Sequence, residues 1–254
     1  MKNKLSIIIL NLFITCTMMS FSQTINEKPV FVIVHGAWGG GWAFKEVDSL
    51  LTAKGATVYR PTLTGHGERV HLASTDIRLE THILDVVNTI LYEDLQNVIL
   101  VGHSYGGMII TGVADSIPER ISKMIYLDAF VPENGESLNA LNRKYGRAGH
   151  ENDNGFVIPV WVPEGTPPPK DVAQSWKTFN DPISLKNPQR SLVPTTFVLF
   201  VDKEKNPEDD DFAWAAERAD KKGWQVLFLE SDHNAQWSTP VELVEMLWNV
   251  GIKN

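Results

Sequence analysis

Cysteine is nearly absent from this sequence. One cysteine, Cys16, stands among 254 residues, and it lies in an N-terminal segment that we expect to be removed. The mature chain would then contain no thiol. This excludes a disulfide framework, a cysteine nucleophile and a thiolate metal ligand.

An excess of positive charge is also lacking. The 23 lysines and arginines are outnumbered by 31 aspartates and glutamates, so the formal net charge is -8. Proteins that bind nucleic acid neutralise phosphates with clustered basic side chains, and the sequence has no basic stripe of this kind. We therefore expect no nucleic-acid partner and favour a small neutral substrate.

The N-terminus has the pattern of a secretory signal peptide. Lys2 and Lys4 precede an apolar run over residues 5–19, which is followed by the small-residue triplet SFS at residues 20–22. A short apolar run between basic and small residues is typical of such peptides. The sequence therefore predicts a secreted or periplasmic protein.

A membrane anchor is the alternative interpretation of this segment. It is disfavoured because Asn11 and Thr15 interrupt an apolar run that is already shorter than a full span. We expect a signal peptide over residues 1–22, a mature domain over residues 23–254, and no stable membrane insertion after cleavage.

The rest of the chain alternates apolar runs with amphipathic stretches. This alternation is typical of βαβ units around a parallel sheet, and it predicts an α/β fold with about six mostly parallel strands. The expected strands cover residues 30–34, 57–60, 97–101, 123–127, 196–201 and 225–229, and the expected helices cover residues 42–53, 81–92, 104–114 and 241–250.

The alternation breaks between the fourth and fifth expected strands. Prolines are frequent over residues 131–194, together with aromatic residues such as Trp161 and Trp176. Long segments of this kind inside a compact domain are usually functional or disordered. The aromatic content favours an ordered cap inserted over the strand ends.

Ser104 has the setting of a catalytic nucleophile. It is the central residue of GHSYG at residues 102–106, between an apolar strand and a small, apolar helix. A serine at a sharp strand-to-helix turn needs flanking glycines for close backbone approach, and the new helix points its N-terminus at developing negative charge. Because a strand precedes the motif and a helix follows it, the motif indicates a catalytic serine far more specifically than the five-residue pattern alone would.

Two backbone amides are candidates for an oxyanion hole. Acyl transfer needs donors placed where negative charge develops. The turn HGAW at residues 35–38 follows the first expected strand. We expect the amides of Ala37 and of Tyr105, the residue after the serine, to supply these donors.

His233 is the expected general base. In this class of fold the chain order is serine, acid and then histidine, and only His150 and His233 follow Ser104. His150 lies in the expected cap. His233 follows the sixth strand, at the edge where ligands collect in open α/β sheets.

The acid that would orient this histidine has three candidates. Asp128 ends the fourth strand among apolar neighbours, where a carboxylate needs a partner to offset its desolvation. Asp202 and Glu204 follow the fifth strand, but they open a highly charged run of the type that is usually solvated. Asp128 leads, and the other two stay open.

Metal and cofactors are not expected. His66 and His71 lie five residues apart in a loop, without helical spacing or an obvious carboxylate third ligand. A structural loop in which Glu68 pairs with Arg69 is the simpler interpretation.

Taken as a set, four motifs resemble bacterial α/β-hydrolases related to plant methylesterases and hydroxynitrile lyases. The resemblance covers about residues 29–250. The motifs are VHGAWGGGW at residues 34–42, PTLTGHGER at 61–69, VGHSYGGM at 101–108 and YLDAFVP at 126–132.

This resemblance implies a six-stranded core, a small cap, and cleavage of compact esters without a cofactor. Ser104, His233 and the Ala37 amide match the family's roles. In the plant branch the acid follows the fifth strand, where this chain has Glu204. Bacterial relatives often lack an acid there, which again favours Asp128.

The favoured function is therefore that of a serine carboxylesterase acting on a small ester through an acyl-enzyme. Trp38, Trp42, Trp161 and Trp176 could line an apolar pocket, and a homodimer is left open. A lactonase would use the same residues on a cyclic ester. A hydroxynitrile lyase is disfavoured because the family's lysine and threonine positions hold Asn234 and Gly36 here, and intact Ser104 and His233 disfavour a non-catalytic binding protein.

Overall fold

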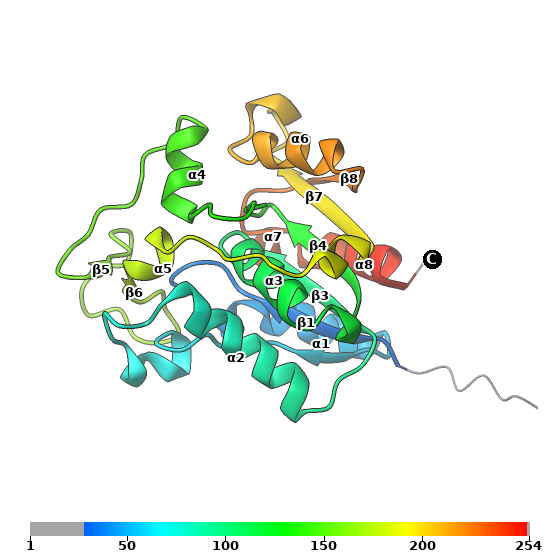
Figure 1. The fold of residues 1–254 in the computed structure, drawn as a ribbon, viewed down its shortest axis with the longest axis horizontal. Helices are drawn as coiled ribbons and strands as arrows, with labels where there is room; N and C mark the ends of the chain where they lie inside the picture. The colour runs from blue at the N-terminus through cyan, green and yellow to red at the C-terminus, as the bar shows by residue number, and fades with distance from the viewer. Residues whose placement is uncertain (1–27, 253–254) are drawn as a thin grey trace, which may run out of the picture.

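A six-stranded parallel sheet forms the centre of the molecule. The computed structural model describes residues 28–252, and its sheet has the strand order β2-β1-β3-β4-β7-β8 (Figure 1). Every neighbouring pair in this sheet is parallel. The strands are β1 Val30–Val34, β2 Thr57–Tyr59, β3 Val98–His103, β4 Ile121–Leu127, β7 Thr195–Val201 and β8 Gln225–Glu230.

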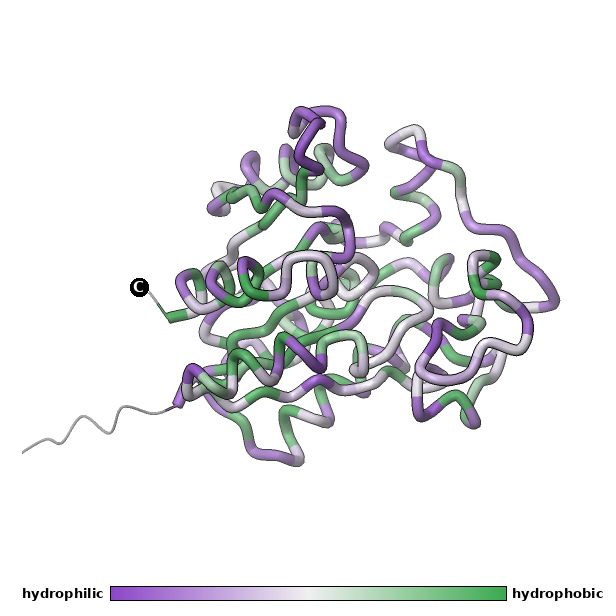
Figure 2. Tube along the Cα trace, turned by 180° about the vertical axis from the view of Figure 1, so that it is seen from behind, coloured by the Kyte–Doolittle hydropathy of each residue, from purple (hydrophilic) through white to green (hydrophobic). Residues whose placement is uncertain are grey.

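Helices cover both faces of this sheet. Helices α1 (Lys45–Ala53) and α8 (Pro240–Ile252) pack on one face and contribute to one hydrophobic core. Helices α2 (Leu79–Tyr92), α3 (Gly106–Ser116) and α6 (Ala213–Lys221) contribute to the core on the other face. Central strands covered on both faces are apolar along their whole length, and Figure 2 shows hydrophobic residues along the central strands.

The chain leaves the sheet between β4 and β7 and forms a small cap. The cap contains α4 (Leu138–Lys144), α5 (Lys177–Asn180) and an antiparallel pair made by β5 (Phe156–Val157) and β6 (Gln174–Ser175), which lie to the left in Figure 1. The remaining short helices are η1 Gly41–Phe44, η2 Gly67–Leu72, η3 Pro118–Arg120, η4 Pro188–Leu192, η5 Pro207–Asp209 and α7 Ala235–Ser238.

One buried cation ties the cap to the sheet domain. The Arg218 guanidinium of α6 forms an ion pair with Glu136 and donates hydrogen bonds to the Val131 carbonyl and the Tyr145 hydroxyl. The side chain of Arg218 is 9% exposed. A buried charge is tolerated only when it is paired and hydrogen-bonded, so this group fixes the first part of the cap against α6.

The predicted fold class is confirmed, with differences at particular elements. All six strands lie where the sequence predicts them, within about two residues, a margin expected for element ends. The helix expected from residue 104 begins at Gly106 instead, because Ser104 and Tyr105 form the turn between β3 and this helix. Helix α6 was not predicted, although the parallel strands β7 and β8 need a connection long enough to hold a helix. The predicted signal peptide lies outside the described residues.

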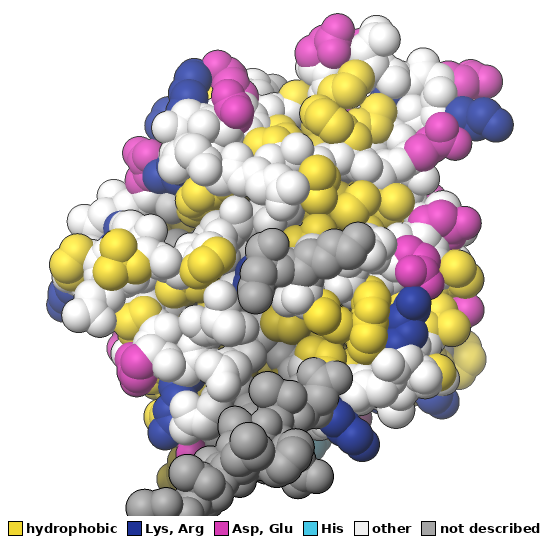
Figure 3. Space-filling view, turned by 90° about the vertical axis from the view of Figure 1, so that its right-hand side faces the viewer, with side chains coloured by type: hydrophobic (Ala, Val, Ile, Leu, Met, Phe, Trp, Pro, Cys, Tyr) yellow, Lys and Arg dark blue, Asp and Glu magenta, His cyan; other side chains and the backbone are white. Residues whose placement is uncertain are grey.

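The surface on the side opposite the cap carries both hydrophobic and charged side chains. Figure 3 shows hydrophobic side chains gathered beside acidic and basic ones on this face. Within residues 28–252, no helix is long and apolar enough to cross a membrane. The expectation of a homodimer stays a prediction.

Candidate active site

Ser104 lies on a strained turn between β3 and α3. Its φ angle is 53°, a left-handed conformation that is unusual for a residue other than glycine and is often associated with function. A Cβ atom on Gly102 would lie 2.7 Å from the Gly106 carbonyl oxygen, and one on Gly106 would lie 2.6 Å from the Val34 carbonyl oxygen. Both glycines are therefore required for the close approach that holds the serine at the strand end.

The turn after β1 brings the backbone amide of Ala37 close to Ser104. A Cβ atom on Gly36 would lie 3.2 Å from the Ser104 Cβ atom, so the two turns touch. Among the described residues, the amides of Ala37 and Tyr105 donate no hydrogen bond within the chain. They are therefore available to an oxygen atom bound at the serine.

The cap holds this turn through hydrogen bonds to both the amide and the carbonyl of Trp38. Trp38 has a φ angle of 62°. Its amide donates to Gln174 Oε1 over 2.9 Å, and its carbonyl accepts from the Val172 amide, also over 2.9 Å. The indole of Trp38 donates to the Val157 carbonyl over 3.1 Å. These contacts lock a conformation that costs about 1 to 2 kcal/mol in an ordinary residue.

His233 and Asp128 are in direct contact. His233 Nδ1 lies 2.6 Å from Asp128 Oδ2, and Asp128 Oδ1 accepts the Phe200 amide over 3.3 Å. Asp128 is 2% exposed. Burial raises the pKa of this carboxyl group, whereas the hydrogen bond and the charge of His233 lower it. The carboxylate therefore depends on this histidine for most of its compensation.

Two further residues hold His233 in place. His103 Nε2 donates to the His233 carbonyl over 2.7 Å, and burial lowers the pKa of the His103 imidazole far enough to keep it neutral. The Phe212 ring stacks on the His233 imidazole with a centroid distance of 5.3 Å and an interplanar angle of 4°. Sequence reasoning missed both roles, although His103 occupies the variable position of the nucleophile motif.

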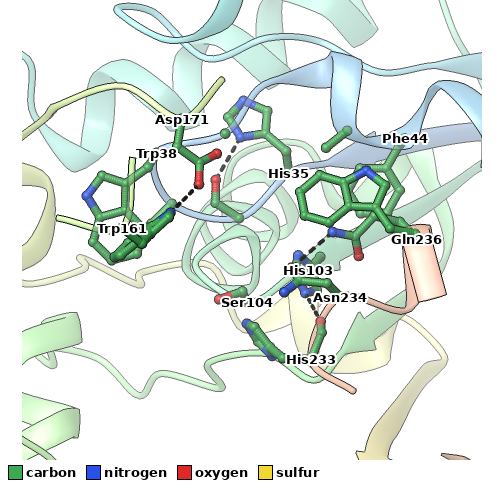
Figure 4. Close-up of a pocket in the computed structure, with 15 residues that line it drawn as sticks. His35, Trp38, Phe44, His103, Ser104, Trp161, Asp171, His233, Asn234 and Gln236 are labelled. Carbon is green, nitrogen blue, oxygen red and sulfur yellow. Dashed lines mark hydrogen bonds between the residues drawn. The ribbon is translucent and has the colours of Figure 1, made fainter. Parts of the chain in front are cut away.

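Ser104 and His233 face one cavity of about 380 Å³ (Figure 4). No hydrogen bond joins the Ser104 hydroxyl to His233 among the described residues. Such bonds are often long and tighten only around the substrate. Residues lining the cavity that the sequence did not single out include Phe44, Asp171, Gln236 and Trp237.

The other predicted residues are distributed as follows. Trp38 and Trp161 line the cavity, and their rings meet edge to face with centroids 4.9 Å apart. Trp176 packs against the core below the cap, and Trp42 stacks on Trp237 at 5.7 Å, so neither lines the cavity.

The two alternative acids lie away from His233. Asp202 forms an ion pair with Lys205 over 3.0 Å, and Glu204 is exposed. Neither contacts the imidazole among the described residues, whereas Asp128 does.

The predicted pairing of Glu68 with Arg69 is wrong. Arg69 pairs with Asp85 over 3.1 Å, while Glu68 accepts the Thr62 hydroxyl over 3.0 Å. In the described part of the chain, no group of three or more His, Cys, Asp or Glu residues could hold a metal ion.

Three buried histidines, His35, His66 and His82, form a polar layer behind the site. His35 Nε2 accepts the Leu63 amide, and His82 bridges the Tyr105 hydroxyl and the Thr64 carbonyl. Burial lowers the pKa of His35 and of His82 to about 4. The imidazoles of His35 and His82 are therefore neutral at physiological pH, and they hold the turns at residues 35–38 and 104–106 as hydrogen-bonding groups.

The fold and the site together define the class of protein. A parallel sheet that presents a strained serine, a histidine and a buried carboxylate at its carboxyl edge is the arrangement of the α/β-hydrolases. The model of the alpha/beta hydrolase family matches residues 31–246. The chain belongs to this family.

Similar proteins include esterases. A carbendazim hydrolyzing esterase of Nocardioides sp. is 37% identical over 248 residues, which cover 87% of this chain and 99% of that protein. Methylesterase 1 of Arabidopsis thaliana is 34% identical over 123 residues, or 47% of this chain and 46% of that protein. The predicted relationship to plant methylesterases is thereby confirmed, and the chain is an enzyme of the ester-hydrolase class.

A solved structure supports the fold. An extracellular alpha/beta-hydrolase from a Paenibacillus species superposes with a TM-score of 0.68 at 20% identity, covering 89% of this chain and 100% of that one.

Proposed function

We propose that the protein is a serine carboxylesterase that cleaves small esters through an acyl-enzyme on Ser104. The observation that carries this proposal is the 2.6 Å contact between Asp128 Oδ2 and His233 Nδ1 beside the strained serine turn. This contact fixes the imidazole with its Nε2 atom free to take the serine proton.

The reaction has two steps. His233 removes the proton from Ser104 as the hydroxyl oxygen attacks the ester carbonyl, and it then returns that proton to the departing alcohol. A water molecule, deprotonated by the same imidazole, releases the acid and restores the serine. Asp128 stabilises the imidazolium form in both steps and is not itself protonated.

The Ala37 and Tyr105 amides would hold the oxyanion. Neither amide is used within the described residues, and both lie on turns that touch at Ser104. Donors that are already in place lose no free energy to reorganisation when the charge develops, and one such donor typically contributes about 2.7 to 4 kcal/mol to transition-state stabilisation.

The nucleophile is tested with a fluorophosphonate probe. We expect the probe to label the wild-type protein and not Ser104→Ala, and Ser104→Ala to lose hydrolysis of p-nitrophenyl esters. A folded wild-type protein that is not labelled would contradict the proposal. A parallel panel of lactones and aryl methyl esters, with carbendazim added because a relative is named for it, defines the preferred ester.

The acid is tested with matched substitutions. Asp128→Asn should reduce kcat by about 10³- to 10⁴-fold, because the amide favours the wrong imidazole tautomer. Glu204→Gln and Asp202→Asn remove the same charge at positions that do not contact His233, and they should leave kcat within about twofold. Loss of turnover only in Glu204→Gln would show that the assignment is wrong.

We also propose that the enzyme is exported. The support is the basic, apolar and small-residue pattern of residues 1–22. N-terminal sequencing of protein recovered from the periplasm or the medium should begin near residue 23. An intact Met1 in the active protein would contradict this.

A further inference from the structure

One side chain in the catalytic cavity has a chemistry that ester cleavage does not require. Asp171 is the only carboxylate among the residues that line the cavity with Ser104 and His233, and no lysine or arginine lines it. The cavity is also lined by four aromatic side chains, Trp38, Phe44, Trp161 and Trp237. Asp171 lies beside Trp38 and Trp161, across the cavity from His233 (Figure 4).

Asp171 is incompletely satisfied. Its Oδ2 atom accepts the Trp161 indole N–H over 2.9 Å. Within residues 28–252 this is its only hydrogen bond, and no cationic side chain pairs with it. The side chain is half-buried, and burial raises the pKa of its carboxyl group, while the Trp161 hydrogen bond lowers it. The Oδ1 atom is thus left with water as its source of donors.

The position of Asp171 is fixed relative to the nucleophile. The next residue, Val172, donates its amide to the Trp38 carbonyl over 2.9 Å. Gln174 accepts the Trp38 amide, and Trp38 belongs to the turn that touches Ser104. A cap segment held in this way cannot easily carry its carboxylate out of the cavity.

We propose that Asp171 is a specificity-determining residue that selects esters with an N–H donor, neutral or cationic, in the part of the substrate that fills the aromatic side of the cavity. This inference rests on the proposed function of the site. A substrate that fills the cavity displaces water from Oδ1, and the lost hydrogen bonds must be replaced. An N–H group replaces them, whereas an ether oxygen does not and a carboxylate adds repulsion. Sites with a buried polar group reject analogues that lack the partner far more strongly than apolar pockets reject a change of shape.

The test uses pairs of substrates that differ in one atom. Methyl esters of indole carboxylic acids, with the ester at different ring positions, are compared with their benzofuran counterparts. The two rings have nearly the same shape, but only indole has an N–H donor. For at least one pair, we expect wild-type kcat/KM to favour the indole ester by about tenfold or more. Half-esters of benzenedicarboxylic acids should be poorer substrates than the matching unsubstituted benzoate.

The matched variants are Asp171→Asn and Glu164→Gln. The first removes the charge inside the cavity, and the second removes a charge from an exposed position of the cap. The indole preference should fall to about threefold or less in Asp171→Asn, since a neutral acceptor binds an N–H donor less strongly than a charged one. Glu164→Gln should keep it.

Four results would be decisive against this role. If the wild type hydrolyses both members of every pair equally, or if Asp171→Asn loses both members in parallel, Asp171 supports the cap and does not recognise a donor. If Glu164→Gln also abolishes the preference, the effect belongs to the overall charge. A wild type that hydrolyses no ester and is not labelled at Ser104 would contradict the proposed function and this inference with it.

Discussion

Replacing Gln174 by leucine should disturb both stability and catalysis, because this buried amide holds the turn that carries the proposed oxyanion donor Ala37. Its Oε1 atom accepts the Trp38 amide over 2.9 Å and contacts His66 Nε2 over 3.1 Å, and its Nε2 atom donates to Thr178 over 2.7 Å. Leucine has a similar size and provides none of these groups. The change therefore tests hydrogen bonding with little change in packing volume.

The magnitude follows from what is left without a partner. Among residues 28–252, the other ring nitrogen of His66 already has no hydrogen-bond partner. The substitution would therefore leave the whole imidazole unsatisfied, together with the Trp38 N–H. A buried donor or acceptor without a partner costs about 1 to 3 kcal/mol, so we expect the free energy of unfolding to fall by about 2 to 4 kcal/mol. A domain with a total of about 5 to 15 kcal/mol would survive this loss.

The effect on turnover should be separable from the effect on stability. The left-handed backbone of Trp38 is held by one hydrogen bond at its amide and one at its carbonyl. When the amide is released, the turn can relax and move the neighbouring Ala37 donor, so kcat should fall by about tenfold or more. The change in KM should be smaller, because the donor acts mainly on the transition state.

Urea unfolding and p-nitrophenyl ester kinetics measure the two effects. Gln189→Leu is the matched control, because Gln189 is exposed near the end of the cap, and it should change neither quantity. A Gln174→Leu variant with wild-type kcat would refute the idea that the cap positions the oxyanion turn, whatever happens to its stability.

Three further outcomes are expected. Stability should decline as the pH falls from about 6.5 towards 4. The folded-state pKa values of His35 and His82 are about 4, so the unfolded chain binds these protons at a higher pH than the folded protein does. Thermal melting across this pH range checks the direction of the change. Gly107→Ala should abolish soluble expression, because the new Cβ atom would lie 2.1 Å from a backbone carbonyl oxygen. Arg218→Met should lower the free energy of unfolding by about 1 to 3 kcal/mol, because the Val131 carbonyl loses its buried donor while Glu136 keeps Lys144, as urea titration would show.

The sequence predicts the parts of the molecule that depend on short, consecutive stretches of residues. The six strands are short apolar runs, and the serine turn is encoded within five consecutive residues. Asp128 could be favoured because a lone carboxylate at the end of an apolar strand needs a partner. Its contact with His233 joins residues 105 positions apart, so the sequence could suggest the pair without giving its geometry.

The sequence does not predict elements with a weak hydrophobic pattern or contacts between residues that are far apart in the chain. Helix α6 escapes a hydrophobic pattern because its buried face consists mainly of Ala215, Ala216 and Ala219, whose small side chains carry little apolar signal. The bond from Trp38 to Gln174 spans 136 positions. Asp171 lies in a proline-rich stretch without periodicity, so only the folded cap reveals that it faces the catalytic cavity.

The same short segment of the cap therefore serves two purposes. Asp171 faces the cavity, while Val172 and Gln174 hold Trp38, which follows the proposed oxyanion donor Ala37. Recognition uses the side chain of Asp171, whereas positioning uses the Val172 amide and the Gln174 side chain. The two can therefore change independently only if residue 171 is exchanged without moving the segment. Specificity should then be altered most easily at residue 171 itself. Insertions or deletions nearby should reduce turnover of every ester, because they displace the oxyanion turn together with the carboxylate.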